Sequence, residues 1–360
     1  MSSSEVATQQ SAPEGADTDA LVVVDHLVRH FGGRKDSQAV RAVDDVSFSI
    51  RRGETFGLVG ESGSGKSTTA RLLMRLDQPT SGRVLFDGDD VYSLSSRALR
   101  RLRPRMQMVF QDPFASLNRR RTVEQTIAFP IRMHQPELGS SERRERVREL
   151  LDLVGLRASH ATAYPRQLSG GQCQRVSIAR ALALGPDFVV LDEAVSAVDV
   201  SIQAQILNLL RDLQERLGLT YLFVSHDLAV VRYMSNSIGV MYHGRIVELG
   251  SREQLFSSPR HPCTHALLAS IPSLETSAEL GRELAIVREE TVAEGSTEGC
   301  RYRGRCPLGF NELCREVEPG LDPVGPGHRA ACHYPQSKEE LQASVAAHAR
   351  ETSTEPADTV

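Results

Sequence analysis

The segment TFGLVGESGSGKS, residues 55–67, decides the fold of this chain. Residues 55–59 have the length of a buried strand, and residues 60–67 fit the pattern G-x-x-x-x-G-K-S. A helix-favouring run, residues 68–76, follows directly. In such a strand–loop–helix, glycines let backbone N–H groups wrap an anion, and the start of the helix adds partial positive charge. The segment therefore predicts a phosphate-binding loop that holds a nucleotide, rather than a Gly-rich turn without a ligand.

Every residue of this loop is a candidate nucleotide ligand. Lys66 can reach the outer phosphates, and the hydroxyl of Ser67 can ligate magnesium. The full set is Gly60, Glu61, Ser62, Gly63, Ser64, Gly65, Lys66, Ser67 and Thr68.

A second candidate anion site lies at residues 168–172, LSGGQ, just before the helix-like run 173–184. Its polar and glycine residues, Ser169, Gly170, Gly171 and Gln172, would sit at a positively polarised helix start. The alternative is a Gly-rich helix cap without a ligand.

Two adjacent carboxylates follow the apolar run 188–191. Asp192 and Glu193 would therefore lie at the C-terminal edge of a buried parallel strand, where open α/β sheets place their ligand sites. As an alternative, either carboxylate could only cap the next helix.

Short apolar runs alternate with longer helical patterns along the chain, which predicts an α/β fold with a parallel sheet. The predicted strands are residues 21–24, 55–59, 106–110, 188–191 and 221–224. His243-Gly244 suits a tight turn between strands at 238–242 and 245–248. The charged region at about 95–170 predicts an inserted helical subdomain.

The net charge and the length of the apolar runs limit the kinds of partner that the chain can be expected to have. The formal net charge is -4, so nucleic acid is not expected, and no apolar run approaches the about eighteen residues of a membrane span. With 40% hydrophobic residues the chain can bury a full core. Residues 1–19 read as a disordered tail, and residues 336–360 as a polar tail.

Taken in this order, the three motifs resemble the nucleotide-binding subunit of an ATP-binding cassette (ABC) transporter, over about residues 20–335. The resemblance implies a P-loop NTPase cassette at 20–265, with a mixed sheet, the helical subdomain and a small Cys-containing C-terminal extension at 266–335. It also implies that two cassettes pair head to tail. Each ATP would lie between Lys66 of one chain and the signature segment 168–172 of the other.

The same resemblance assigns the hydrolytic residues. Asp192 holds Mg²⁺ with Ser67, and Glu193 is the general base for the attacking water. Gln111 belongs to the loop that senses magnesium and water and faces the membrane partner. His226 is the switch histidine that contacts the γ-phosphate.

Two weaker assignments complete the predicted site. Asp199 matches a loop that carries contact between the two cassettes. Phe31 is the candidate for stacking on adenine, although a core or turn aromatic is the equal alternative. Departures from the common family wording, at Ala194, Val198, Arg119 and Cys173, remove none of the phosphate, magnesium or water contacts.

The tail carries a second resemblance. Residues 261–268, HPCTHALL, resemble the His-Pro-Tyr-Thr segment of oligopeptide, dipeptide and nickel importers. Four further cysteines follow, Cys300, Cys306, Cys314 and Cys332. Zinc and unligated thiols remain alternatives, but four soft thiolates suit an iron–sulfur cluster, and the resemblance implies a [4Fe-4S] cluster on them.

The sequence thus predicts an ATP-hydrolysing subunit of an ABC importer for oligopeptides or dipeptides, peripheral at the cytoplasmic face of the cell membrane. Its expected partners are two permease subunits, a second ABC ATPase subunit and an extracytoplasmic substrate-binding protein. Nickel or another small solute is an alternative cargo, and a soluble non-transport ABC ATPase is the competing class. Arginine runs at 97–105 and 119–121 are either solvated faces or sites for lipid headgroups or acidic permease groups.

Overall fold

The centre of the fold is a run of parallel strands that includes the strand before the phosphate loop. The computed structural model describes residues 19–32, 39–196, 198–269, 271, 298–308, 312–337, 339–341 and 343–344. The main sheet has the order β11-β12-β10-β9-β3-β8-β7-β6, and β9, β3, β8, β7 and β6 are mutually parallel. Its strands are β3 (Thr55–Val59), β6 (Met106–Val109), β7 (Phe188–Asp192), β8 (Thr220–Ser225), β9 (Ser237–Tyr242), β10 (Arg245–Ser251), β11 (Asp322–Gly325) and β12 (His328–Ala330).

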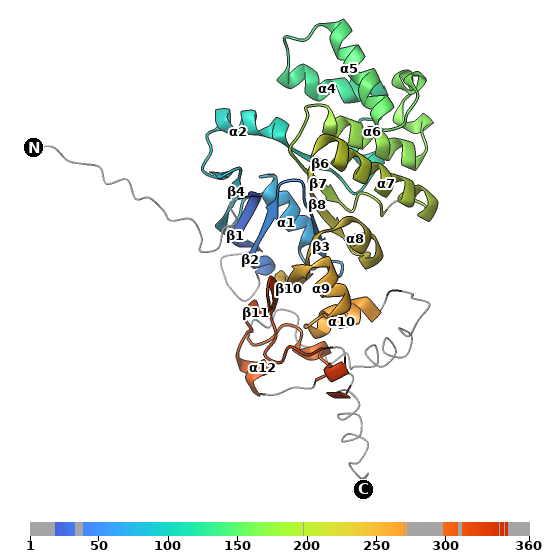
Figure 1. Ribbon diagram of the computed structural model, residues 1–360. Coiled ribbons are helices and arrows are strands. Elements are labelled where there is room, and N and C mark those ends of the chain that lie inside the picture. The colour runs from blue at the N-terminus through green and yellow to red at the C-terminus, as the bar shows by residue number, and fades with distance from the viewer. Residues whose placement is uncertain are drawn as a thin grey trace, which may run out of the picture.

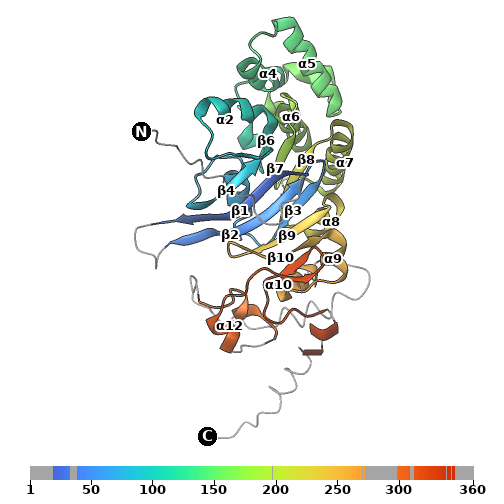
Figure 2. The ribbon, with the colours of Figure 1, turned by 60° about the vertical axis from the view of Figure 1, so that its left-hand side comes forward.

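An antiparallel sheet covers one side of this core, as Figures 1 and 2 show. Its order is β2-β1-β4-β5, with β1 (Ala20–Phe31), β2 (Val40–Arg51), β4 (Ser81–Phe86) and β5 (Asp89–Asp90). The sequence predicted only the first residues of β1. β2 and β4 combine apolar residues with charged and polar ones, and β5 is only two aspartates, so none of them forms a continuous apolar run.

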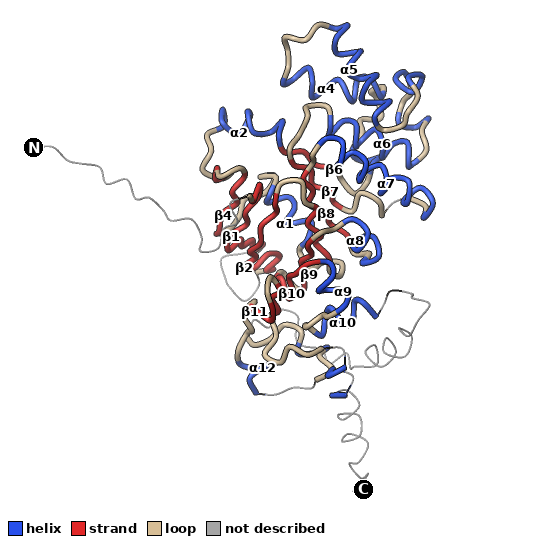
Figure 3. The backbone as a smooth tube through the Cα atoms, in the orientation of Figure 1, coloured by secondary structure: helices blue, strands red, loops and turns tan. Residues whose placement is uncertain are grey.

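Helices connect the strands and build a separate lobe. They are α1 (Lys66–Leu73), α2 (Ser96–Leu102), α3 (Pro113–Ser116), α4 (Val123–His134), α5 (Ser140–Leu153), α6 (Gly170–Leu182), α7 (Val200–Leu217), α8 (Leu228–Met234), α9 (Arg252–Ser257), α10 (Pro262–Ala269) and α12 (Glu312–Glu316). Short 3₁₀ turns are η2 (Arg103–Arg105), η3 (Ala158–Thr162), η4 (Pro165–Gln167) and η5 (Arg303–Arg305). Figures 1 and 3 show α4 and α5 projecting beyond the sheet, in the region where the sequence predicted a helical subdomain.

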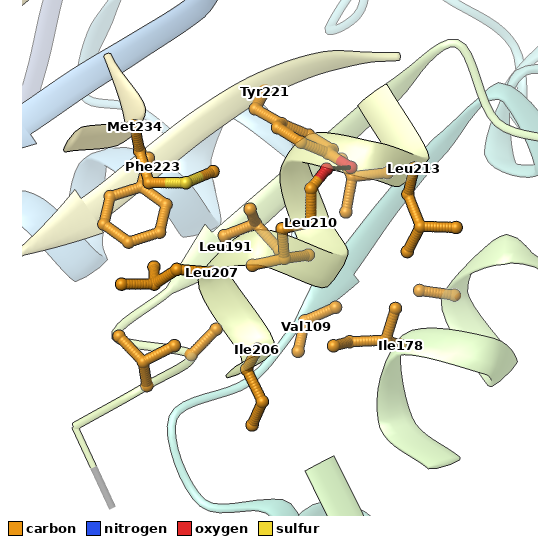
Figure 4. Close-up of a cluster of buried hydrophobic side chains, with 14 of the residues drawn as sticks. Val109, Ile178, Leu191, Ile206, Leu207, Leu210, Leu213, Tyr221, Phe223 and Met234 are labelled. Carbon is orange, nitrogen blue, oxygen red and sulfur yellow. Dashed lines mark hydrogen bonds between the residues drawn. The ribbon is translucent and has the colours of Figure 1, made fainter. Parts of the chain in front are cut away.

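The side-chain alternation of β7 explains why the sheet has a core on each face. Val189 and Leu191 pack into a cluster with α6, α7 and α8, while Val190 packs into the cluster formed with α1 and the antiparallel sheet. Figure 4 shows the first cluster, in which Leu207 and Leu210 of α7 lie over β7 and β8. A strand buried on both faces reads as a continuous apolar run, so the sequence revealed it.

The C-terminal extension continues the cassette sheet. β12 pairs antiparallel with β10, through Glu248↔Ala330 and Leu249↔Arg329. The turn between β9 and β10 is the predicted one, with positive φ at His243 (43°) and Gly244 (85°). Residues 1–18 of the predicted tail at 1–19, and most of the predicted tail at 336–360, lie outside the described residues.

Candidate functional site

The phosphate loop is shaped by close backbone packing. Gly65 precedes α1 in the left-handed region (φ 106°), and a Cβ there would overlap the carbonyl of Ala42 in β2. The ammonium of buried Lys66 donates to the carbonyls of Gly60 (2.8 Å) and Glu61 (2.7 Å). Burial lowers the pKa of Lys66, against the opposing charges of Glu193 and Asp192. The loop therefore holds one cation inside a ring of its own polar groups.

A hydroxyl and a carboxylate meet beside this cation, as a magnesium site requires. Ser67 Oγ donates to Asp192 Oδ1 at 2.9 Å, joining α1 to the end of β7. Asp192 is 7% exposed, and burial raises the pKa of its carboxyl, with the charge of Glu193 adding to the effect. Hard oxygen ligands next to a phosphate loop are what Mg²⁺ prefers.

Three strand ends bring together Glu193, Gln111 and His226. Gln111 Nε2 donates to Glu193 Oε2 at 2.6 Å, and His226 Nδ1 lies 3.2 Å from Glu193 Oε1. Glu193 has a positive φ of 47°, which a non-glycine residue rarely adopts. Strain of this kind concentrates at functional sites, where the surrounding contacts hold the side chain in one direction.

The signature segment begins α6 and lies apart from the phosphate loop. Ser169 caps the helix, accepting from the amide of Gln172 at 3.3 Å while Gln172 Oε1 accepts from the amide of Ser169 at 3.0 Å. A Cβ at Gly171 would lie 2.5 Å from Ile202 Cγ2, whereas at Gly170 the nearest side-chain atoms are 3.9 Å away. Within the described part of the chain, no hydrogen bond joins residues 168–172 to residues 60–68. Gly171 is thus required for close packing against α7, whereas Gly170 has room for a methyl group.

Comparisons with known proteins decide the family. A family profile described as ABC transporter matches residues 43–196, and one described as oligopeptide/dipeptide transporter, C-terminal region, matches residues 247–314. The oligopeptide transport ATP-binding protein AppF of Bacillus subtilis is 48% identical over 82% of this chain and 89% of its own. The chain belongs to the ATP-binding subunits of the peptide ABC transporter family.

Two further relatives support this ABC ATPase assignment. A putative peptide import ATP-binding protein of Brucella ovis is 49% identical over 87% of this chain and 97% of its own. The cassette MJ0796, solved as a post-hydrolysis dimer bound to ADP and Pi, superposes with a TM-score of 0.59 and 31% identity. That match covers 64% of this chain and 98% of the other.

Asp199 and Phe31, the two weaker assignments made from the sequence, lie at the ends of secondary-structure elements of the ABC ATPase. Asp199 is the N-cap position of α7, and its neighbour Val198 approaches the start of α6 at Gly170. Phe31 ends β1 and pairs with Val40 of β2. Its ring is 38% exposed under the guanidinium of Arg29, 4.4 Å from the ring centroid.

All four tail cysteines of the ABC subunit line one cavity, together with His261 and Tyr302. Burial raises the pKa of Cys306 and Cys332 to about 12 and also raises the pKa of Cys300. Among the described residues, no group of three or more His, Cys, Asp or Glu is arranged for a single metal ion. Cys173 and Cys263 are buried and are not among the residues that line this cavity.

Sequence reasoning missed the residues that join the extension to the phosphate loop. Arg305 Nη1 lies 2.7 Å from both carboxylate oxygens of Glu61. Arg301 donates to the carbonyl of His243 at 2.5 Å and to Glu318 at 2.7 Å, and it also pairs with Asp44. In the sequence, the RYRGR segment at 301–305 is only a group of arginines between two cysteines. Its partners lie far away along the chain, so the sequence could not predict these contacts.

Two arginines of the run at 97–105 form hydrogen bonds and ion pairs within the fold. Arg103 donates to the backbone of Met74 and Arg75, and Arg105 pairs with Asp87 and Asp187. Across the described ranges, no helix is both long and apolar enough to cross a bilayer.

Proposed function

We propose that this chain hydrolyses ATP at the sheet edge, with Glu193 as the base that activates water. The observation that carries the proposal is the position of Glu193 between Gln111 and His226, beside the Ser67–Asp192 pair. In the reaction, water attacks the γ-phosphorus, the bond to the ADP oxygen breaks, and Glu193 accepts the proton of the water. Lys66 exchanges the carbonyls of its own loop for phosphate oxygens.

Magnesium fits this site. Ser67 and Asp192 would hold it. Gln111, which is hydrogen-bonded to the neighbouring Glu193, is the third proposed magnesium residue. When bound, Mg²⁺ neutralises phosphate charge in the transition state. Burial raises the pKa of Asp192 and so disfavours its ionised form. A bound Mg²⁺ would oppose this effect and favour the carboxylate.

The working ATPase is a head-to-tail pair of cassettes. Among the described residues, no hydrogen bond joins the signature start to the phosphate loop of the same chain, and this supports the arrangement. The relative MJ0796 was solved as a dimer with ADP and Pi. Ser169, Gly170 and Gly171 of one cassette would close over the nucleotide of the other, and Asp199 would lie at the contact.

The transported cargo is an oligopeptide or dipeptide. The names of the relatives, and the peptide-transporter profile over residues 247–314, support this cargo over nickel. Two permease subunits and an extracytoplasmic substrate-binding protein would complete the importer, with this chain peripheral at the cytoplasmic membrane face.

The four tail cysteines are the proposed ligands of an iron–sulfur cluster, with zinc as the alternative. What supports the cluster is that four soft thiols, far apart in sequence, line one cavity. Cys300, Cys306, Cys314 and Cys332 would hold a [4Fe-4S] cluster, which would tie the segments that carry them together when bound.

Affinity isolation of the tagged chain from gently solubilised native membranes tests the importer. Mass spectrometry should recover two multi-spanning permeases and a second cassette subunit, and an attached binding protein would indicate the cargo. A mock isolation from untagged cells is the control. Recovery of ribosomes or nucleic acid, or of no partner, would leave only the ATPase.

A further inference from the structure

One side chain of the cysteine-bearing extension reaches the phosphate loop. Arg305 immediately precedes Cys306, and its Nη1 lies 2.7 Å from Oε1 and 2.7 Å from Oε2 of Glu61. Glu61 is the second residue of the loop, and its own carbonyl accepts from Lys66 at 2.7 Å. The two residues are 244 positions apart, so only the docking of the extension brings them together.

Aromatic residues hold Arg305 in this direction. Its guanidinium donates to the hydroxyl of Tyr242 and lies 6.0 Å from the ring centroid of Tyr302. Tyr302 is 4% exposed and packs edge-on against Tyr242, with ring centroids 5.1 Å apart. The arginine is therefore positioned by buried groups on both sides, although its own side chain is 48% exposed.

A second connection runs through the turn between β9 and β10. The amide of Gly244 donates to the carbonyl of Ser64 in the phosphate loop at 2.9 Å. The carbonyl of the neighbouring His243 accepts from Arg301 at 2.5 Å. Residues 300–306 thus contact the loop directly, through Arg305, and indirectly, through this turn.

Because Glu61 is negatively charged, its contact with Arg305 should affect nucleotide binding. A carboxylate at the edge of a triphosphate site repels the nucleotide, and an adjacent guanidinium cancels that repulsion. Both side chains are partly exposed, so solvent reduces the effect to a modest one.

We propose that Arg305 is a positioning residue for nucleotide binding, supplied by the extension, which neutralises Glu61 and couples the segment between Cys300 and Cys306 to the phosphate loop. The inference rests on the proposed nucleotide site at Lys66. It does not require a cluster, because the contact belongs to the chain itself. Since coupling is reciprocal, bound nucleotide must also stabilise residues 300–306.

Calorimetric titration of the full-length chain with MgATP at low ionic strength tests the charge effect. Arg305→Gln should raise Kd about two- to five-fold, and the difference should shrink at high salt. Adding Glu61→Gln to Arg305→Gln should restore Kd to near the wild-type value. Arg329→Gln, on the exposed face of β12, is the matched control and should bind as wild type.

Wild-type affinity in Arg305→Gln would overturn the proposal, and so would a double variant as weak as Arg305→Gln alone. Hydrogen exchange followed by mass spectrometry tests the coupling: MgATP should slow exchange at residues 300–306 more in the wild type than in Arg305→Gln, which keeps only the connection through the turn. Equal protection in both proteins would also overturn it. Failure of the underlying nucleotide site would look different, because Lys66→Ala would then bind MgATP as tightly as the wild type.

Discussion

The side-chain amide of Gln111 donates a 2.6 Å hydrogen bond to Oε2 of Glu193, across the ends of the neighbouring strands β6 and β7. This bond occupies one carboxylate oxygen, while the other faces His226. Two partners therefore fix the direction of the carboxylate, and this geometry makes its role testable by a substitution that keeps the shape.

Glu193→Gln should bind ATP normally and hydrolyse it about 10²- to 10⁴-fold more slowly, because the amide cannot accept the proton of the attacking water. Phosphate release by the assembled transporter, together with nucleotide binding, measures the two effects. Glu215→Gln, exposed on α7, is the control and should turn over normally. Near-normal turnover in Glu193→Gln would remove this residue from the base role.

Asp192→Asn should make the nucleotide-free protein more resistant to heat at neutral pH. Burial raises the pKa of Asp192, so the native state takes up a proton more readily than the unfolded chain. Its ionised carboxylate therefore opposes folding at pH values above the native pKa, and that opposition fades as pH falls. The variant should also lose most of the added thermal stability that MgATP gives. Thermal unfolding with and without MgATP measures both, and an unchanged MgATP effect would contradict the magnesium role.

Gly171→Ala should destabilise the fold by about 1–3 kcal/mol, because the new methyl group would lie 2.5 Å from Ile202 Cγ2. Gly170→Ala is the matched control, since its methyl group would meet only atoms at 3.9 Å. Denaturant unfolding should therefore separate the two variants. If both were equally stable, packing against α7 would not explain the second glycine.

Glu248→Ala should cost about 3–5 kcal/mol, because it breaks a buried charged network that fastens the extension to β10. Glu248 is 0% exposed, and its carboxylate lies 2.7 Å from His328 Nε2 and accepts from the amides of Arg260 and His261. Burial alone would raise the pKa of Glu248, but these hydrogen bonds outweigh burial and lower it. The network therefore stabilises the fold above the ordinary glutamate pKa of 4.5, and this stability is lost as pH falls through the native pKa. Denaturant unfolding of both proteins at pH 7 and under acid conditions checks the cost and its sign.

Anaerobically purified protein should contain iron and sulfide in equal amounts, and Cys306→Ser should lose both. Cys173→Ala, which removes a thiol far from the cavity, should keep them. Zinc without sulfide, or no metal in the wild-type protein, would contradict the cluster.

The parts of the fold that sequence revealed were those with local signals. Buried parallel strands such as β7 read as apolar runs, and His243-Gly244 marked a turn that needs positive φ. β2 was missed because charged and polar residues interrupt its apolar ones, and β4 was missed because only three apolar residues follow its Ser-Gly-Arg start. The nucleotide motifs were readable because each is contiguous, whereas the Arg305–Glu61 contact depends on how the tail docks.

The pairing of β12 with β10 makes the extension a cover for an otherwise open sheet edge. Without it, β10 would present unpaired backbone groups and the buried carboxylate of Glu248 to solvent or to another chain. The hairpin moves that edge outward to β11, a strand of only four residues that contains Pro323, and short proline-bearing edges resist pairing. A cassette trimmed of its tail would therefore be prone to self-association, so the tail also protects the sheet from pairing with a second copy of the chain.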